Sequence, residues 1–554
     1  MDKRKITSCD MVVTNELILR NIFDFLPIRD LKNVRLTSHL WKDVCCPIFQ
    51  RKSIVKLNEN VHLEGSVMDN FLEKFATIPS TRVLFRNYKI SLFNFDFNCD
   101  AMDAFWEKFG PSMESLQIEW VRFVGVDIVR DIFFNLTPNL KHLSIKDCSF
   151  YENYGGERPG LRIYKQVADV DENVPVNPNL ISMHFCGGEK HTTLPISWEE
   201  IFRGFPNIRD LSFYNISAAD TDGIMQIAKS LRTKNPRIMQ LEKLNIFNGD
   251  YATGEIVVPI MDNLISLKLF LRELSIDLGA TVNFHRTSLL LQQQRNARKM
   301  ILYRGPLGTP MKKFPFDIIF PNLQYLEMTE TVADCMEFLQ FMPNLSTLAL
   351  KEPPEVEPPF LPIDTIAKTD MNFTKMPLQT KLSTLIVEYD ISSADVRKLV
   401  FWFPAVVKAR LYLDNDAFRT VCGEWRKLEE LEVLGERLDT EGITGIQETR
   451  SGETPVKKCN PINIKELKYL RKFIMVNYKI STTIDDVCVN EGFMKMPHLN
   501  YLELCTKHIS EKGWTKLFNW AQLRTLIPTD GRWDSEVKAF EKGCYQLKSN
   551  RIGT

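Results

Sequence analysis

The chain has 554 residues, more than one ordinary hydrophobic core can organise, with 70 basic and 70 acidic side chains. This balance excludes a global field that would draw the chain to nucleic acid or a membrane, so we expect neither as a partner. An apolar fraction of 44% is typical of a folded protein, and the absence of a secretory signal or long apolar run predicts a cytoplasmic and/or nuclear location.

Residues 12–54 predict a compact helical module after a flexible N-terminus at residues 1–11. Thr14 or Asn15 can cap a first helix, because their side-chain oxygens accept hydrogen bonds from the first backbone N–H groups. Pro27 would end this helix, since it lacks a backbone N–H. The apolar side chains of the helix recur at helical spacing. They are Leu17, Ile18, Ile22, Phe25 and Leu26.

Two shorter helices are expected after the break at Pro27. Asp30 is predicted to cap the second helix, which carries Leu31. A third helix carries Trp41, and Pro47 is expected to follow its end. Together the three predicted helices make a module that is too small to bury all its apolar side chains alone.

The spacing of these residues resembles the F-box. The pattern joins a proline break, an acidic residue that follows it and a tryptophan. It consists of Glu16-Leu17, Ile22-Phe23, Leu26-Pro27, Asp30-Leu31, Val34-Arg35-Leu36 and Trp41. One departure is Thr14, which stands where the family usually has proline. The resemblance implies a docking surface for a Skp-family adaptor, which joins the F-box to a cullin scaffold.

An excess apolar stripe on so small a module also predicts a partner, independently of the resemblance. Trp41 is expected to lie inside the module. The residues predicted to face the adaptor are Leu17, Ile18, Ile22, Leu26, Pro27 and Leu31. The alternative is that the module only caps the N-terminal end of a repeat array, as such arrays require.

After this module, a short phrase recurs through the chain: Pro-Asn-Leu-x-x-Leu-x-apolar. Copies with the leading proline begin at Pro138, Pro178, Pro206, Pro321 and Pro343, with a near copy at Pro497. Further copies begin at Met113, Leu241, Leu264, Leu382, Val406, Leu428, Leu470 and Leu523. The alternation in Leu-x-Leu indicates a short strand with two side chains inward and the x positions outward. Helical stretches such as 220–231 lie between the copies.

The repeat resembles leucine-rich repeats, whose periods of 20–29 residues include the 22-residue step from Leu323 to Leu345. The resemblance implies an α/β fold: a three-helix F-box, then a curved solenoid over residues 55–527, with a parallel sheet on its concave face and helices on its convex face. Residues 528–554 would form a C-terminal cap or tail. Insertions are predicted near residues 151–177, 279–320, 351–380 and 445–465. The alternative is an unrelated α/β enzyme with Leu-rich strands.

The outward strand positions are the candidates for substrate binding, because they line the concave face of such a solenoid. These candidates are His142, Lys146, Tyr214, Tyr325, Glu327 and Tyr501. Residues 279–316 add a basic stretch in which residues 289–300 could form an amphipathic helix. Its candidates are Arg295, Arg298 and Lys299, which could hold an acidic or phosphorylated segment. A solvated helix is the simpler interpretation of this stretch.

The sequence carries no phosphate-binding loop, nucleophile elbow or zinc-ligand spacing, and its 12 cysteines include no C-x-x-C pair. We therefore expect no metal, no cofactor and no catalysis. The predicted function is that of the substrate-recognition subunit of an SCF-type (Skp–cullin–F-box) ubiquitin ligase, which binds a protein substrate for ubiquitin-dependent degradation. The alternative is a leucine-rich-repeat interaction scaffold whose F-box is vestigial or non-degradative.

Overall fold

A computed structural model describes most of the chain, which divides into two compact units, Met1–Asp277 and Leu278–Thr554. The described residues are 14–58, 66–75, 85–91, 100–124, 126–151, 176–187, 196–216, 218–235, 240–247, 254–278, 284–303, 318–329, 339–351, 379–434, 437–447, 458–459, 462–476, 484–506 and 508–528. No helix in these ranges is both long and apolar enough to cross a membrane.

The first unit begins with helices α2 (Glu16–Phe25), α3 (Ile28–Val34) and α4 (His39–Lys52). Asn15 caps α2 as predicted: its side chain accepts hydrogen bonds from the backbone N–H groups of Leu17 (3.0 Å) and Ile18 (3.2 Å). Ser38 caps α4 by accepting a bond from the N–H of Trp41 at 3.1 Å. The module thus has the expected helical composition.

Two of the predicted helix boundaries are wrong. Helix α3 begins directly after Pro27, which is its N-cap, so Asp30 lies in the first turn and does not cap the helix. Helix α4 does not end at Pro47 but runs through it to Lys52. Val44 and Ile48, on either side of Pro47, are both buried, so packing on both turns offsets the hydrogen bond that the proline cannot donate.

The core of this module is a closed cluster contributed by all three helices. It consists of Leu19, Phe23, Leu31, Val44, Cys45 and Ile48. The Trp41 ring packs edge-on against Phe23, with 5.4 Å between the ring centroids, which agrees with its predicted place inside the module. Helices α2, α3 and α4 are therefore held together by their own apolar contacts.

The rest of the first unit is a parallel sheet in which each strand pairs with the strand before it. Its strands are β1 (Ile54–Asn58), β2 (Asn87–Ser91), β3 (Ser115–Glu119), β5 (His142–Lys146), β7 (Ser182–Cys186), β8 (Asp210–Tyr214), β9 (Lys243–Phe247) and β10 (Glu273–Asp277). Leu116 opposes Leu143 and Ile118 opposes Ile145. All four are buried, so the predicted alternation is confirmed.

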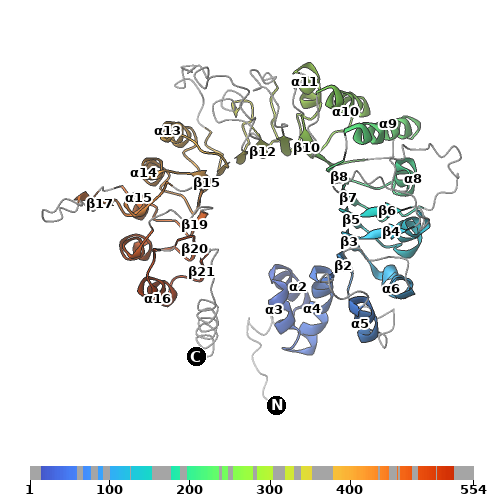
Figure 1. Cartoon of the computed structure of the whole chain (residues 1–554), viewed down its shortest axis with the longest axis horizontal. Helices are drawn as coiled ribbons and strands as arrows, with labels where there is room; N and C mark the ends of the chain where they lie inside the picture. Colours follow the sequence, from blue (N-terminus) through green and yellow to red (C-terminus); the bar gives the residue numbers. More distant parts are fainter. Residues whose placement is uncertain are drawn as a thin grey trace, which may run out of the picture. The chain divides into compact units, whose positions relative to one another are not determined.

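The helices of this unit lie along one side of the sheet (Figure 1). They are α5 (Ser66–Phe75), α6 (Asp100–Phe109), α7 (Val126–Asp131), α8 (Trp198–Gly204), α9 (Ala218–Lys234) and α10 (Gly254–Leu267), with short turns η2 (Gly110–Ser112) and η3 (Ile132–Leu136). A small parallel pair, β4 (Arg122–Val124) and β6 (Ser149–Tyr151), follows two of the strands. The helix predicted over residues 220–231 is confirmed as part of α9, with Ile224, Ala228 and Leu231 buried.

The second unit repeats this arrangement, again with each strand parallel to its predecessor. Its strands are β11 (Lys299–Tyr303), β12 (Tyr325–Met328), β13 (Thr347–Leu350), β14 (Thr384–Val387), β15 (Lys408–Tyr412), β16 (Glu430–Leu434), β19 (Lys472–Val476), β20 (Tyr501–Leu504) and β21 (Thr525–Pro528). Strands β17 (Ile446–Gln447) and β18 (Lys458–Cys459) form an antiparallel pair. Its helices and turns are α11 (Phe284–Gln293), α13 (Ser393–Trp402), α14 (Asn415–Glu424), α15 (Thr440–Thr444), α16 (Glu511–Asn519), η6 (Ile464–Glu466), η7 (Cys488–Gly492) and η8 (Phe493–Lys495).

Two parts of the predicted repeat pattern are wrong. The copy placed at Leu264 lies at the end of helix α10, and the strand of that repeat is β10. The helix predicted over residues 289–300 ends at Gln293, and the chain turns into strand β11 at Lys299. Residues 284–303 are therefore a helix and a strand of the repeat, within the segment predicted as an insertion.

The expected α/β class and parallel pairing are confirmed within each unit, while the predicted domain boundaries stay predictions. Several of them fall on residues outside the described ranges. These are the N-terminus at 1–11, most of the insertions near 151–177 and 351–380, part of those near 279–320 and 445–465, and nearly all of the tail at 528–554.

Candidate functional site

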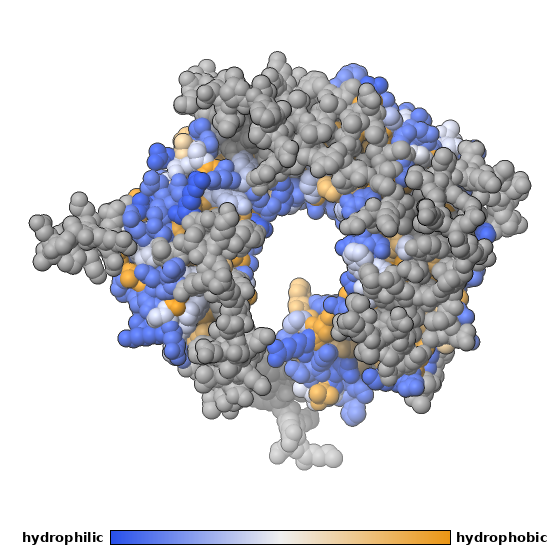
Figure 2. Space-filling model, viewed as in Figure 1, coloured by the Kyte–Doolittle hydropathy of each residue, from blue (hydrophilic) through white to orange (hydrophobic). Residues whose placement is uncertain are grey.

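The helices α2–α4 expose one set of apolar residues while they bury another. Leu17 is 68% exposed and Ile22 44%, and Ile18 is also exposed, although all three belong to the same helix as the buried Leu19 and Phe23. In Figure 2, apolar residues gather over the part of the molecule formed by α2–α4. An apolar patch on a module that already has a closed core indicates a contact surface for a partner.

Polar contacts join the helices of this module to each other and to the sheet of the first unit. The Lys52 ammonium donates to the carbonyl of Leu26 at 3.0 Å, which satisfies a backbone acceptor at the end of α2. The side-chain amide of Asn87 in β2 donates to the carbonyl of Ser53 at 3.1 Å, directly after α4. The exposed residues of α2 are therefore presented from a fixed support.

The six residues predicted to face a partner differ in their exposure to solvent. Leu17, Ile18, Ile22 and Pro27 are exposed, whereas Leu26 is half-buried against the core cluster.

The prediction that Leu31 faces the adaptor is wrong. Leu31 is 0% exposed, and its carbonyl accepts a hydrogen bond from the Cys45 thiol at 3.3 Å. In the seven-residue helix α3, the one buried position supports the core and is not available to a partner. Four exposed apolar residues of this module were not predicted for the surface: Phe25, at 89%, Ile28, Leu36 and Leu40.

The outward strand positions of the first unit carry three predicted substrate-binding residues. His142 and Lys146 are exposed at the two ends of β5, and Tyr214 is exposed at the end of β8. Partial burial lowers the pKa of His142, and the nearby Asp210 carboxylate opposes that shift. These residues share a face of the sheet, but no contact joins His142, Lys146 and Tyr214 to one another in the described structure.

The second unit brings three predicted residues together. The Lys299 ammonium lies 4.8 Å from the ring centroid of Tyr325, a cation–π contact between β11 and β12. The Tyr325 hydroxyl donates to Glu327, as does the hydroxyl of Tyr303 at 3.1 Å. Glu327 is buried between them and does not offer a free carboxylate, which corrects its predicted role.

The remaining predicted residues lie at separate places in this unit. Tyr501 repeats the arrangement of Tyr325 on strand β20, where its hydroxyl donates to Glu503 at 2.9 Å. Arg295 is exposed in the turn after α11, and Arg298 is exposed just before β11. They do not form the helical face that was predicted, because β11 begins at the next residue.

One cluster contains the residue types of a nucleophilic triad without its geometry. The Ser182 hydroxyl lies 2.9 Å from Nε2 of His184, and the Asp210 carboxylate lies 3.9 Å from the same nitrogen. A triad needs the acid and the nucleophile on opposite ring nitrogens.

Burial also raises the pKa of the Cys148 and Cys488 thiols to about 12, which disfavours the reactive thiolate.

The helical module defines the class: this chain carries an F-box. The F-box domain family matches residues 15–47, which span the helices and core described above. F-box domains generally bind a Skp-family adaptor and so link to a cullin scaffold.

Among solved structures, the chain is similar to one in the Toll–Spatzle complex of Drosophila, at 12% identity and a TM-score of 0.31. The similarity covers 75% of this chain and 51% of that one, so this chain spans about half of its length. A TM-score this low does not establish a shared fold. The comparison with curated proteins finds no match.

Proposed function

We propose that this chain is the non-catalytic substrate-recognition subunit of an SCF-type ubiquitin ligase, in the cytoplasm and/or nucleus. The observation that carries the proposal is the F-box at residues 15–47, with Leu17, Ile18 and Ile22 exposed and not packed against the first strands. An open apolar face favours adaptor docking over the alternative, in which the module only caps a repeat array.

In the proposed mechanism, the chain acts by holding the adaptor and the substrate close together. The F-box would bind the Skp-family adaptor, and the outward face of a leucine-rich-repeat solenoid would bind a protein substrate. A substrate lysine held near a ubiquitin-charged partner reacts at a raised effective concentration, so the chain needs no catalytic group of its own.

The test is adaptor binding by the full chain with Ile18→Asp and Ile22→Asp together. Both residues are exposed, so the changes should leave the fold intact while placing two carboxylates in the contact. We expect the Kd for the purified Skp-family adaptor, measured by calorimetry, to rise by about 100-fold or more. Leu26 is left unchanged because it packs against the core.

The matched control is Ile181→Asp, since Ile181 is similarly exposed but precedes strand β7, outside the F-box. It should bind the adaptor like the wild type. A folded wild-type chain that does not bind the adaptor would contradict the proposal. That result would favour a leucine-rich-repeat scaffold with a vestigial F-box.

A further inference from the structure

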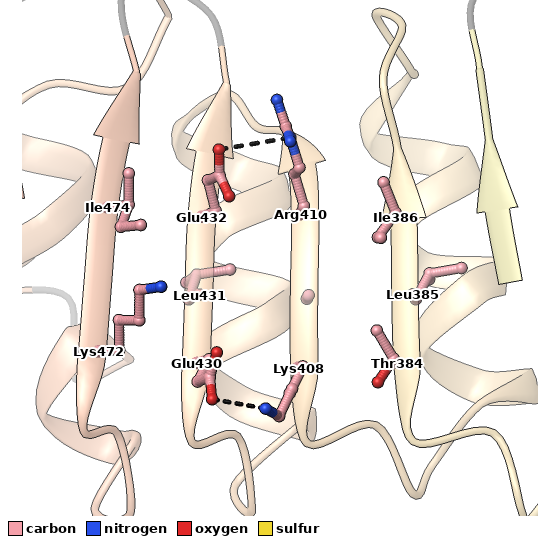
Figure 3. Close-up of a pocket in the computed structure, with 11 residues that line it drawn as sticks. Thr384, Leu385, Ile386, Lys408, Arg410, Glu430, Leu431, Glu432, Lys472 and Ile474 are labelled. Atoms are coloured by element: carbon pink, nitrogen blue, oxygen red, sulfur yellow. Dashed lines mark ion pairs between the residues drawn. The ribbon is translucent and has the colours of Figure 1, made fainter. Parts of the chain in front are cut away.

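A shallow pocket of about 190 Å³ lies on the outward face of the second unit, across strands β14, β15, β16 and β19. Two rows of side chains cross these strands (Figure 3). One row is Thr384, Lys408, Glu430 and Lys472, and the other is Ile386, Arg410, Glu432 and Ile474. We call this surface the β14–β19 groove.

Most of the charge in the groove is internally balanced. Lys408 pairs with Glu430 at 2.7 Å, and Arg410 lies 3.3 Å from both Glu432 and Glu388. Figure 3 shows the first two of these acids facing the basic residues of the neighbouring strand. A ligand carboxylate that binds Lys408 or Arg410 would therefore compete with a carboxylate of the chain itself.

Lys472 differs from the other cations of the groove. Within the described ranges it has no ion pair, and its contact is with the ring of Tyr501, whose centroid lies 4.9 Å from the ammonium. The ring orients the ammonium but does not neutralise it. Burial and the bond to Glu503 raise the pKa of Tyr501 to about 12, so the tyrosine stays uncharged. Lys472 is therefore the cation of the groove that has no ion-pair partner among the described residues.

Apolar side chains stand at both ends of the second row. Ile386 is half-buried on β14, and Ile474 is largely buried on β19 next to Lys472. Three strand steps of about 4.8 Å separate them, or roughly 14 Å, which an extended chain spans in about four or five residues at ~3.3 Å per residue. Two aliphatic side chains of one extended segment match this spacing.

Two features of the groove decide the class of its occupant. Its volume of about 190 Å³ is below the ~300–1,000 Å³ of sites that enclose small molecules, which favours a few side chains of a protein. On the next strand Glu430 opposes Lys472 and Glu432 opposes Ile474, and these two carboxylates disfavour a doubly charged phosphate. A single carboxylate matches the one cation that has no ion-pair partner among the described residues.

We propose that the β14–β19 groove binds an extended protein segment with an aliphatic side chain at each end and one carboxylate side chain, which pairs with Lys472. This inference rests on the proposed role as a substrate receptor, and it names the substrate class as an acidic, aliphatic segment without phosphorylation.

The probe is a pool of pentapeptides, acetyl-Ile-x-Asp-x-Ile-amide, with the second and fourth positions randomised, because residues 1, 3 and 5 of an extended segment face the same side. Binding to the full chain is followed by the NMR signals of the Ile386 and Ile474 methyl groups, assigned from Ile→Val variants. We expect both signals to shift with the Asp pool, and an Asn pool to bind about tenfold more weakly. No shift with the Asp pool overturns the proposal. Stronger binding by a phosphoserine pool, or shifts caused by an oligothymidine strand, also overturns it.

The variant Lys472→Met should weaken binding of the Asp pool about tenfold. Its matched control is Lys299→Met, because Lys299 also lies over a tyrosine ring without an ion pair among the described residues, yet lies outside the groove. Equal losses in both variants would overturn the assignment. Lys472→Met should bind the adaptor normally, and the Ile18→Asp, Ile22→Asp chain should bind the peptide pool normally. Failure of either proposal is thus visible separately.

Discussion

His142 shows how a single residue on the sheet can set a pH dependence. Burial lowers its pKa below the ordinary value of 6.5, against the opposing effect of Asp210. The unfolded chain therefore binds a proton more readily than the folded chain as the pH falls through 6.5. We expect the stability of the first unit to be full above that pH and to decrease below it.

Replacing His142 with Gln removes this proton uptake. The measurement is the urea concentration at the unfolding midpoint at pH 7.5 and at pH 5.5. The decrease in midpoint between the two pH values should be smaller in His142→Gln than in the wild type. Equal decreases would show that the pH dependence arises elsewhere, for example from Glu114, whose pKa is lowered because Lys141 and Arg86 outweigh its burial.

Hydropathy alone does not separate the two groups of F-box residues. Leu17 and Leu31 are the same residue type in the same predicted stripe, yet one is exposed and the other is in the core. The difference depends on where α4 crosses the other helices, which is a property of tertiary packing. The same limit explains Glu327: strand alternation predicts that it points outward, but not that Tyr303 and Tyr325 cover it.

Alanine substitutions at two glycines test the backbone packing of the first unit. Gly223 lies inside helix α9, where an added Cβ would meet nothing within 4 Å. Gly223→Ala should therefore stabilise the first unit by about 0.5–1 kcal/mol, because alanine loses less backbone entropy in a helix. Gly110→Ala should destabilise it, since the added Cβ would lie 2.2 Å from the backbone carbonyl oxygen of Leu136. Thermal unfolding of both variants measures the opposite shifts.

Neither glycine lies in the F-box, so both variants should bind the adaptor like the wild type when folded. A stabilising effect of Gly110→Ala would mean that the carbonyl of Leu136 moves freely. That result would contradict the close approach described for these two segments.

The strands of this protein are more predictable than its helix boundaries. Leu140-x-x-Leu143-x-Ile145 identified β5 because alternation and the preceding Pro-Asn act together. Strand β11 was missed because its repeat begins with Ala297 instead of a proline and leucine, and basic residues surround it. Pro47 led to the wrong prediction that α4 ends there. A proline is a local signal, whereas the packing that keeps α4 helical to Lys52 depends on the tertiary structure.

At the scale of the whole chain, the F-box should work without the second unit. Its core cluster is closed within residues 19–48, and its contacts to Asn87 lie in the first unit. A chain of residues 1–277 should bind the Skp-family adaptor with a Kd within about threefold of that of the full chain, since a threefold change is less than 1 kcal/mol. Calorimetry on both chains is the measurement.

The chain of residues 1–277 should not bind the Asp peptide pool, because it lacks the β14–β19 groove. A folded residue 1–277 chain without adaptor affinity would show that docking requires parts of the second unit. Circular dichroism distinguishes that case from a chain that fails to fold.

The fold class followed from recurrence, whereas the binding surfaces did not. The repeated phrase occurs many times in the chain, so the predicted architecture does not depend on any single copy. The wrong placement of one copy at Leu264 therefore leaves it unchanged. Lys472 has no distinguishing signal of this kind. Its importance lies in which neighbours are already paired, and that depends on the side-chain positions of four adjacent strands.

The strand order also has a consequence for synthesis on the ribosome. Every strand of each sheet pairs with the strand made before it, so each repeat can dock as soon as it leaves the exit tunnel, without waiting for a distant partner. At ~5–20 residues per second, the 277 residues of Leu278–Thr554 take roughly 14–55 s to translate after the first unit. During that interval the nascent chain already carries a complete F-box, so an adaptor present in the same compartment can bind before the groove residues have been translated.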